Sequence, residues 1–154
     1  MEYLVRDARI TDAERITALL AGAAGAPQAD ARATLGAADL LRQLVYLPSA
    51  VVLVAEAQRT IVGAGMLALR PSVGQGGFVG SIDLLLVEPG FEASGVRDAL
   101  VAELLRMARN KGCVAVEAPR PAGAADVAAW EGCGFADGAP HIVCELAPRG
   151  ALRT

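Results

Sequence analysis

Hydrophobic and polar positions repeat with two different periods along the chain, and these periods separate predicted helices from predicted strands. Apolar residues recur every third or fourth position, as on one face of a helix, in segments 11–22, 35–47, 95–110 and 124–131. Other segments alternate or are apolar on both faces, which favours strands, namely 3–9, 50–57, 61–69, 78–87, 113–118 and 141–146. This mixture of helices and strands predicts an α/β (α+β) fold with a central mixed sheet flanked by helices.

The clearest helix is predicted over residues 95–110, between two strands that are apolar on both faces. Its apolar stripe repeats every fourth residue, at Val96, Leu100, Leu104 and Ala108. The strands 78–87 and 113–118 flank it, which makes a strand–helix–strand unit whose two strands are expected to be parallel. Because both strands are apolar on both faces, we expect both in the centre of the sheet.

Boundary signals lie between these elements. Thr11 and Glu14 have the spacing of a capping box at the start of the first helix. The strands 50–57 and 61–69 are close enough in sequence to form a hairpin. Several glycines between Pro71 and Gly80 predict a mobile loop there.

Length and composition narrow the class of protein. A chain of 154 residues, 54% of them hydrophobic, can bury one core, so we expect a single domain over residues 1–147 and a frayed tail over 148–154. No apolar run reaches the ~18 residues of a membrane-spanning helix, and the first residues do not resemble a signal peptide. We therefore expect a cytoplasmic protein without membrane contact.

Charge and cysteine content exclude two further classes. The net charge is −3, and binding to nucleic acid requires a basic surface, so we expect no nucleic-acid partner. Cys113, Cys133 and Cys144 match no zinc-binding spacing. We expect these thiols to be reduced and the protein to hold no metal.

The segment 87–97 is the candidate ligand site, because it joins a buried strand to the start of the long helix. The first amides of a helix have no backbone acceptor and attract anions, and Gly95 leaves room for a phosphate. Gly90 and Gly95 have the spacing of a nucleotide loop, but Val96 and Arg97 stand where that loop requires Lys and Ser or Thr. A purely structural interpretation, in which Gly95 only starts the helix, stays open.

The order of motifs along most of the chain resembles the GNAT family, the acyl-CoA-dependent N-acetyltransferases. The resemblance is carried by Val-Arg-Asp-Ala-Arg-x-x-Asp-Ala-x-x-Ile (5–16), Val-Ala-Glu (54–56) with Ile-Val-Gly-Ala (61–64), Leu-Val-x-Pro (86–89) with the turn that follows, and Trp-Glu-Gly-Cys-Gly-Phe (130–135). The resemblance implies acetyl-CoA or another acyl-CoA as cosubstrate, and an amine of a small molecule or peptide as acceptor. A homodimer is compatible with the apolar first and last segments of the chain.

The resemblance also implies a coenzyme site. Backbone groups of the strand end would bind the pantetheine and thioester, and amides of the turn would bind phosphate. The residues implied are Leu86, Val87, Ala93, Ser94, Gly95, Val96 and Arg97.

Two carboxylates are candidates for a catalytic base or for binding the amine. Asp83 lies in an otherwise apolar strand, and Glu56 lies on the neighbouring one. An ordinary paired or exposed carboxylate is an equally good interpretation of each. Trp130 occupies the place of the tyrosine that often serves as acid in the family, but an indole has no proton to give. His141 is expected to be exposed or structural.

A second hypothesis follows from departures on the coenzyme side. Glu92, Ala93 and Arg97 replace the arginine or glutamine, the glycine and the small residue usual in the turn, and Gly123 replaces an asparagine. A carboxylate near a pyrophosphate is unfavourable by ~1 kcal/mol. Arg97 or Arg120 would compensate if it reached the phosphates. The alternative to the enzyme is therefore a non-catalytic GNAT-like module that acts through a protein partner or another ligand.

Overall fold

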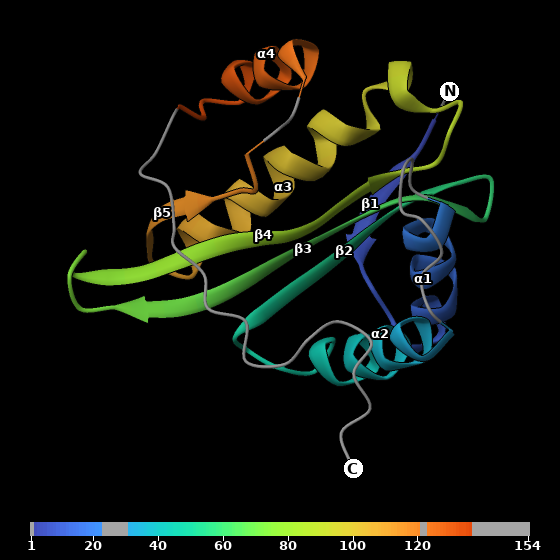
Figure 1. Cartoon of the computed structure of the whole chain (residues 1–154), viewed down its shortest axis with the longest axis horizontal. Coiled ribbons are helices and arrows are strands. Elements are labelled where there is room, and N and C mark those ends of the chain that lie inside the picture. Colours follow the sequence, from blue (N-terminus) through green and yellow to red (C-terminus); the bar gives the residue numbers. More distant parts are fainter. Residues whose placement is uncertain (1, 23–30, 121–122, 137–154) are drawn as a thin grey trace. The chain divides into compact units, whose positions relative to one another are not determined.

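The computed structural model describes residues 2–22, 31–120 and 123–136. Contacts divide the chain into two compact units, Met1–Arg120 and Pro121–Thr154, and each is described separately. The first unit contains the sheet and most of the helices (Figure 1). The described part of the second unit contains one helix, α4 (Ala124–Gly132). The single domain expected over residues 1–147 therefore stays a prediction.

The first unit is a five-stranded mixed sheet with helices between its strands, as the hydrophobic pattern predicts. The strands are β1 (Leu4–Asp7), β2 (Ala50–Ala57), β3 (Thr60–Ser72), β4 (Gly77–Val87) and β5 (Cys113–Glu117), in that spatial order. The helical segments are η1 (Ile10–Asp12), α1 (Ala13–Gly22), α2 (Ala31–Leu44), η2 (Glu92–Ser94) and α3 (Val96–Asn110). Among the described strands, β4 and β5 are the one parallel pair, and α3 connects them, so the predicted strand–helix–strand unit is confirmed.

Helices pack on both faces of the sheet (Figure 1). One core forms between α1, α2 and one face of β2 and β3, from Ala13, Ile16, Leu19, Leu41, Val52, Val54, Ile61, Ala64 and Met66. The opposite face is covered by α3, whose buried stripe is Val96, Leu100, Val101, Leu104 and Ala108. The buried stripe is the one that the four-residue spacing predicts.

Two glycines in β3 let α3 lie close to the sheet. A β-carbon on Gly63 would lie 2.8 Å from Cγ1 of Val96 and 3.1 Å from Cδ1 of Leu100, and one on Gly65 would lie 3.0 Å from Cδ1 of Leu104. The glycines therefore set how closely the first turns of α3 approach the strands.

The loop predicted between Pro71 and Gly80 is shorter than expected, a turn over residues 73–76. β3 continues to Ser72 and pairs with β4 from Gly77 onward, and Pro71 faces Phe78. Glycine marks close packing here: a β-carbon on Gly77 would lie 2.7 Å from Cγ1 of Val114, and one on Gly80 2.8 Å from Cδ1 of Leu67. Proline is tolerated because β2 pairs with β3 no further than Ala68, which leaves no neighbour for the missing N–H.

Two further details concern the predicted elements. β5 is the last strand of the sheet within the described residues, and Val114 in it is 55% exposed. The strand expected at 141–146 lies outside those residues, so the central position expected for β5 stays a prediction. The helical segment begins at Ile10, and Asp12 rather than Thr11 accepts a hydrogen bond from a backbone amide, that of Arg9, at 2.8 Å. The predicted strand 141–146, which includes His141, and the tail 148–154 lie outside the described residues. In the described part of the chain, no helix has the length and apolar character needed to cross a membrane.

Candidate functional site

The candidate site begins where β4 continues past its pairing with β5. The parallel ladder joins β4 residues Phe78–Ser81 to β5 residues Cys113–Glu117. β4 then runs on through residues 82–87 along β3, which pairs with it up to Val87. Within the described residues, this last part of β4 has a strand partner on the β3 side only. Its other edge is open for a ligand that can pair with a strand.

The antiparallel ladder shows which residues present their backbone groups to this open edge. The amide of Glu88 donates to the carbonyl of Val62 at 2.8 Å, and the Leu86 carbonyl also faces β3, 3.1 Å from the position of a β-carbon on Gly63. Backbone groups alternate in direction along a strand, so those of Leu85 and Val87 point away from β3. Leu86, expected to contact the coenzyme through its backbone, has these groups directed to β3, whereas those of Leu85 and Val87 face the other edge of β4.

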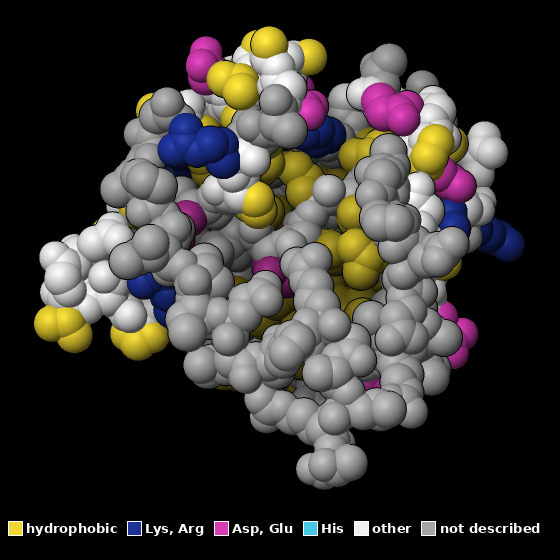
Figure 2. Space-filling view, in the orientation of Figure 1, with side chains coloured by type: hydrophobic (Ala, Val, Ile, Leu, Met, Phe, Trp, Pro, Cys, Tyr) yellow, Lys and Arg dark blue, Asp and Glu magenta, His cyan; other side chains and the backbone are white. Residues whose placement is uncertain are grey.

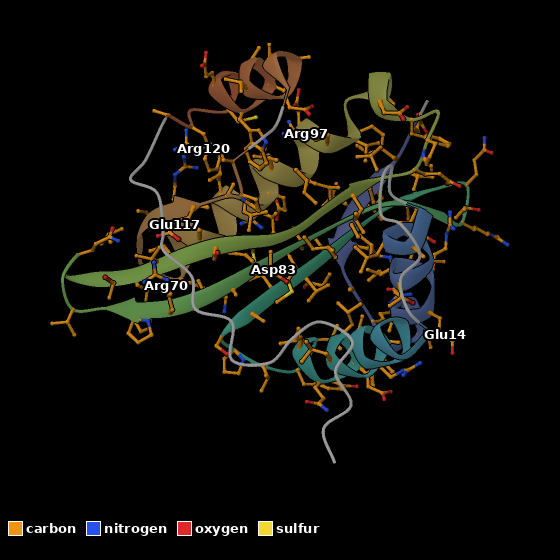
Figure 3. The ribbon with its side chains drawn as sticks, viewed as in Figure 1. Glu14, Arg70, Asp83, Arg97, Glu117 and Arg120 are labelled. Atoms are coloured by element: carbon orange, nitrogen blue, oxygen red, sulfur yellow. The ribbon has the colours of Figure 1, made fainter. Side chains whose placement is uncertain are left out.

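A bulge in β4 lies at Asp83, just beyond the last residue paired with β5. Ile82 is paired with Leu67 and Leu84 with Met66, so Asp83 is an extra residue with no partner in the register. Bulges bend a strand and redirect its side chains. The side chain of Asp83 is exposed rather than buried, and it lies midway along the sheet (Figure 3).

Apolar residues flank Asp83 in the sheet: Ile82 and Leu84 on β4, and Leu67 and Met66 across from them on β3. Figure 2 shows hydrophobic side chains in the middle of this face, with acidic side chains beside them. Leu84 and Leu86 pack against the core formed with α1 and α2. An exposed carboxylate next to an apolar surface is suited to accept a proton from a bound amine.

The turn after β4 leads directly to the first amides of α3. Phe91 N–H donates to the Glu88 carbonyl at 3.0 Å, and Ser94 donates both its amide and its hydroxyl to the Phe91 carbonyl. Ser94, predicted to contact the coenzyme, therefore uses these donors to shape the turn. Gly95 precedes α3 in the left-handed conformation, with φ of 84°. The left-handed backbone at Gly95 is by itself a reason for glycine there. The sequence alone could not distinguish this reason from the need for room beside a phosphate.

The amides at the start of α3 form the end of the candidate site that is suited to bind an anion. Val96 is fully buried and anchors the first turn of the helix against the sheet. The first residues of a helix have no acceptor four residues earlier, and the helix dipole places partial positive charge there. Arg97 adds a guanidinium in the same turn, with its Nη1 3.7 Å from Oδ1 of Asp98. The arrangement fits an anionic group at the end of an extended ligand.

Glu92 brings a carboxylate into this turn. It accepts a hydrogen bond from the amide of Gly90, at 2.8 Å between N and Oε2. Gly90 has a φ of 96°, so the backbone folds back far enough for this short contact. The carboxylate therefore binds one of the amides of the turn that follows β4.

An ion pair holds the start of the turn to α1. Nη2 of Arg15 lies 2.9 Å from Oε2 of Glu88, and Nε of Arg15 donates to the carbonyl of Ile61 at 3.2 Å. These contacts tie α1 to the ends of both β3 and β4. The sequence contained no signal for this pair, because its members are far apart along the chain.

Glu56, the second candidate base, lies in an ion-paired cluster. Its Oε2 accepts from Nε of Arg6 at 3.0 Å, and the same guanidinium contacts both oxygens of Asp12, at 2.8 and 3.2 Å. The hydrogen bond to Asp12 raises the pKa of Arg6 further above its usual value. Burial acts to raise the pKa of Asp12, but the bonds from Arg6 and from the Arg9 amide outweigh it and lower that pKa. This cluster ties β1, β2 and η1 together.

Trp130 and Gly123 lie in the second unit. Trp130 is in α4 and packs edge to face on Phe135, with ring centroids 4.8 Å apart. Gly123 is the residue that precedes α4, in extended conformation. Among the described residues, no group of acidic, histidine or cysteine side chains has the arrangement of a metal site.

An open strand edge that ends at a helix N-terminus is suited to an extended ligand with an anionic end. The sequence matches the acetyltransferase (GNAT) family over residues 12–135, and the chain therefore belongs to that family. Membership implies an acyl-CoA cosubstrate, as the resemblance predicts.

Particular relatives extend this comparison. A glucosamine 6-phosphate N-acetyltransferase of Trypanosoma brucei brucei is 37% identical over 57 residues, which are 36% of this chain and 39% of that protein. The match thus spans well under half of that relative. The crystal structure of an acetyltransferase from Trypanosoma brucei superposes with a TM-score of 0.72 and 25% identity, over 94% of this chain and 100% of the other. A transcriptional regulator from Bacillus halodurans C-125 has a TM-score of 0.82 at 16% identity, over 94% and 100%, and so shares the fold.

Proposed function

We propose that the chain is an N-acetyltransferase that transfers an acetyl group from acetyl-CoA to an amine. The observation that carries this proposal is the open edge of β4 at Leu85 and Val87, which runs directly to the first amides of α3. The groups of an acyl-CoA follow one another in a matching order: a pantetheine arm with two amides, which suits the strand edge, and then a pyrophosphate, which suits the helix start.

Backbone groups bind most of the donor. The N–H and C=O groups of Leu85 and Val87 pair with the amides of pantetheine as a neighbouring strand would. The amides of Gly95, Val96 and Arg97 bind the pyrophosphate, and the Arg97 guanidinium adds a positive charge. Donor binding through backbone groups tolerates side-chain changes in the turn, because the backbone amides are present whatever the side chain is.

Asp83 is the proposed base. It accepts a proton from the ammonium form of the acceptor, and the neutral amine nitrogen then attacks the thioester carbon. A C–N bond forms, the C–S bond breaks, and a backbone N–H of the open β4 edge stabilises the charge on the carbonyl oxygen. The attacking nitrogen gives up its second proton to water as the amide forms, and the leaving thiolate takes a proton from water, so the products are an amide and a free thiol.

A small amine is the proposed acceptor, and an amino sugar phosphate is the first member of that class to test. The relative that is 37% identical carries the name of an enzyme acting on glucosamine 6-phosphate. An amine of a peptide is the second acceptor class.

The decisive experiment is calorimetric titration with acetyl-CoA, followed by an assay of thiol release with glucosamine 6-phosphate and a panel of other amines. We expect micromolar binding of acetyl-CoA to the wild-type chain, and weaker binding to Gly95→Glu, which adds both a side chain and a negative charge at the turn. Folding of the variant is checked by circular dichroism. If the folded wild-type protein gave no heat of binding at millimolar acetyl-CoA, the proposal that the chain is an acetyltransferase would be rejected.

A non-catalytic GNAT-like module is the second candidate. Its specific support is the pair of changes at Glu92, which accepts a bond from a turn amide, and at Trp130, which lacks a transferable proton. The titration separates the two candidates, because a module that has lost the donor binds acetyl-CoA no better than it binds an unrelated nucleotide.

A further inference from the structure

Glu92 differs from the other carboxylates around the turn in what it contacts. Glu88 is paired with Arg15 at 2.9 Å, and Asp98 lies 3.7 Å from Arg97. Glu92 takes part in none of the ion pairs formed by the described residues, and its contact is the Gly90 amide. Its side chain is exposed. Glu92 therefore brings to the turn a negative charge that is held by a backbone amide and not by an ion pair among the described residues.

The negative charge of Glu92 lies in the turn that is proposed to bind the phosphates of the donor. Glu92 is the first residue of η2, three positions before Gly95, and its carboxylate is held near the turn by the bond to Gly90. Like charges separated by a few ångströms of water repel by ~1 kcal/mol, which corresponds to a factor of about five in affinity. The open edge at Leu85 and Val87 is part of β4 and precedes the turn, so the charge has little effect on an uncharged pantetheine arm.

We propose that Glu92 is a specificity-determining residue of the donor site. It lowers the affinity for the phosphates of the donor and leaves the affinity for pantetheine unchanged. As a result, the wild-type chain discriminates less strongly between acyl-CoA and smaller acyl-pantetheine donors than a variant without the charge at position 92 would. The inference rests on the proposed function, because it assumes that acyl donors bind along β4 and the turn.

The experiment compares ligands with and without phosphate on matched variants. Coenzyme A, 3′-dephospho-coenzyme A and pantetheine are titrated into the wild-type chain, Glu92→Gln, Glu92→Ala and Glu103→Gln. Glu92→Gln keeps an oxygen acceptor for the Gly90 amide and removes the charge. Glu103→Gln makes the same change of net charge on α3, where Glu103 pairs with Arg106 away from the turn.

We expect both Glu92 variants to bind coenzyme A and its dephospho form about fivefold more tightly, with pantetheine unchanged and with Glu103→Gln like the wild type. The gain is expected to shrink as the salt concentration rises. An equal gain for pantetheine would overturn the proposal, as would a gain for Glu92→Ala alone, which would point to the freed Gly90 amide instead of the charge.

The two possible failures are distinguishable. If the wild-type chain binds coenzyme A and Glu92→Gln binds it equally well, the role of Glu92 is rejected and the enzyme stands. If neither the folded wild type nor the folded variants bind coenzyme A at millimolar concentration, the proposed function is rejected and the role of Glu92 with it.

Discussion

Gly63 in β3 lies directly beneath Val96, the first residue of α3, and a β-carbon on Gly63 would come within 2.8 Å of Cγ1 of Val96. The same β-carbon would lie 3.1 Å from the carbonyl oxygen of Leu86. One glycine therefore borders both the start of the helix and the strand end that leads to the open edge. Its missing side chain links the packing of the core to the geometry of the proposed donor site.

Gly63→Ala is expected to lower the free energy of unfolding by about 1–3 kcal/mol, because the added methyl group meets buried Val96 and the backbone of β4. It is also expected to weaken acetyl-CoA binding, since the first turn of α3 must shift. Urea denaturation and calorimetry measure the two effects. Gly36→Ala in α2 is the matched control. A β-carbon on Gly36 would meet no atom within 4 Å beyond the backbone of its own helix, so alanine there should stabilise the protein by about 0.5–1 kcal/mol. Equal stability of Gly63→Ala and wild type would contradict the close approach.

Gly95→Ala is expected to cost about 1 kcal/mol of stability for a different reason. The φ of Gly95 is 84°, which alanine adopts with strain, whereas the nearest atom to an added β-carbon is Oη of Tyr3 at 3.5 Å, an ordinary contact. Asparagine enters the left-handed region more readily, so Gly95→Asn should retain more stability than Gly95→Ala. Thermal or urea unfolding ranks the variants. If alanine proved the better tolerated of the two, the backbone conformation would not be the reason for glycine.

Asp12 is expected to make stability depend on acid. Its pKa is lower in the folded chain than in the unfolded chain, because the bonds from Arg6 and the Arg9 amide outweigh the effect of burial. The unfolded chain therefore takes up the proton more readily, so the stabilisation is complete above the unfolded pKa of about 4 and is lost as the pH falls below it. Asp12→Asn should lower the free energy of unfolding by about 2 kcal/mol near neutral pH. The stability of this variant should also decrease less steeply than that of the wild type as the pH falls.

Asp39→Asn is the control for that series. Asp39 forms an exposed ion pair with Arg42 one helical turn away, so its removal should change stability by well under ~1 kcal/mol at any pH. Urea midpoints measured between about pH 7 and about pH 3 test both variants. Parallel pH profiles for Asp12→Asn and wild type would show that Asp12 is not the group responsible.

The sequence predicts the elements of the site better than their edges. The apolar stripe of α3 and the apolar run of β4 locate the strand and helix that form the turn, because these periods depend only on local burial. The bulge at Asp83 is not predictable in this way, since one extra residue in a strand is visible only in its pairing with Met66 and Leu67. The direction of the Leu85 and Leu86 backbone groups depends on that same register.

Ion pairs show the same limit. Arg6 and Glu56 are 50 positions apart, and nothing local indicates that the carboxylate is held by a guanidinium. The sequence offered Asp83 as a candidate base and Glu56 as a second option. In the structure the Glu56 carboxylate accepts a hydrogen bond from Arg6, whereas the side chain of Asp83 is exposed. Glycines were similarly ambiguous: Gly77 and Gly80 predict a loop by composition, whereas in the sheet they make room for Val114 and Leu67.

Asp83 and Glu56 are therefore expected to differ when each loses its charge. Asp83→Asn should lower kcat by about 10²-fold with the acceptor identified in the thiol-release screen, with little change in stability or acetyl-CoA affinity, because the side chain is exposed and is proposed to act as the base. Glu56→Gln should lower the free energy of unfolding by about 1 kcal/mol through its bond to Arg6 and leave kcat nearly unchanged. Steady-state kinetics and urea denaturation on the same preparations measure both. A loss of kcat confined to Glu56→Gln would transfer the role of base to Glu56. Loss in neither would mean that a group other than these two carboxylates takes the proton.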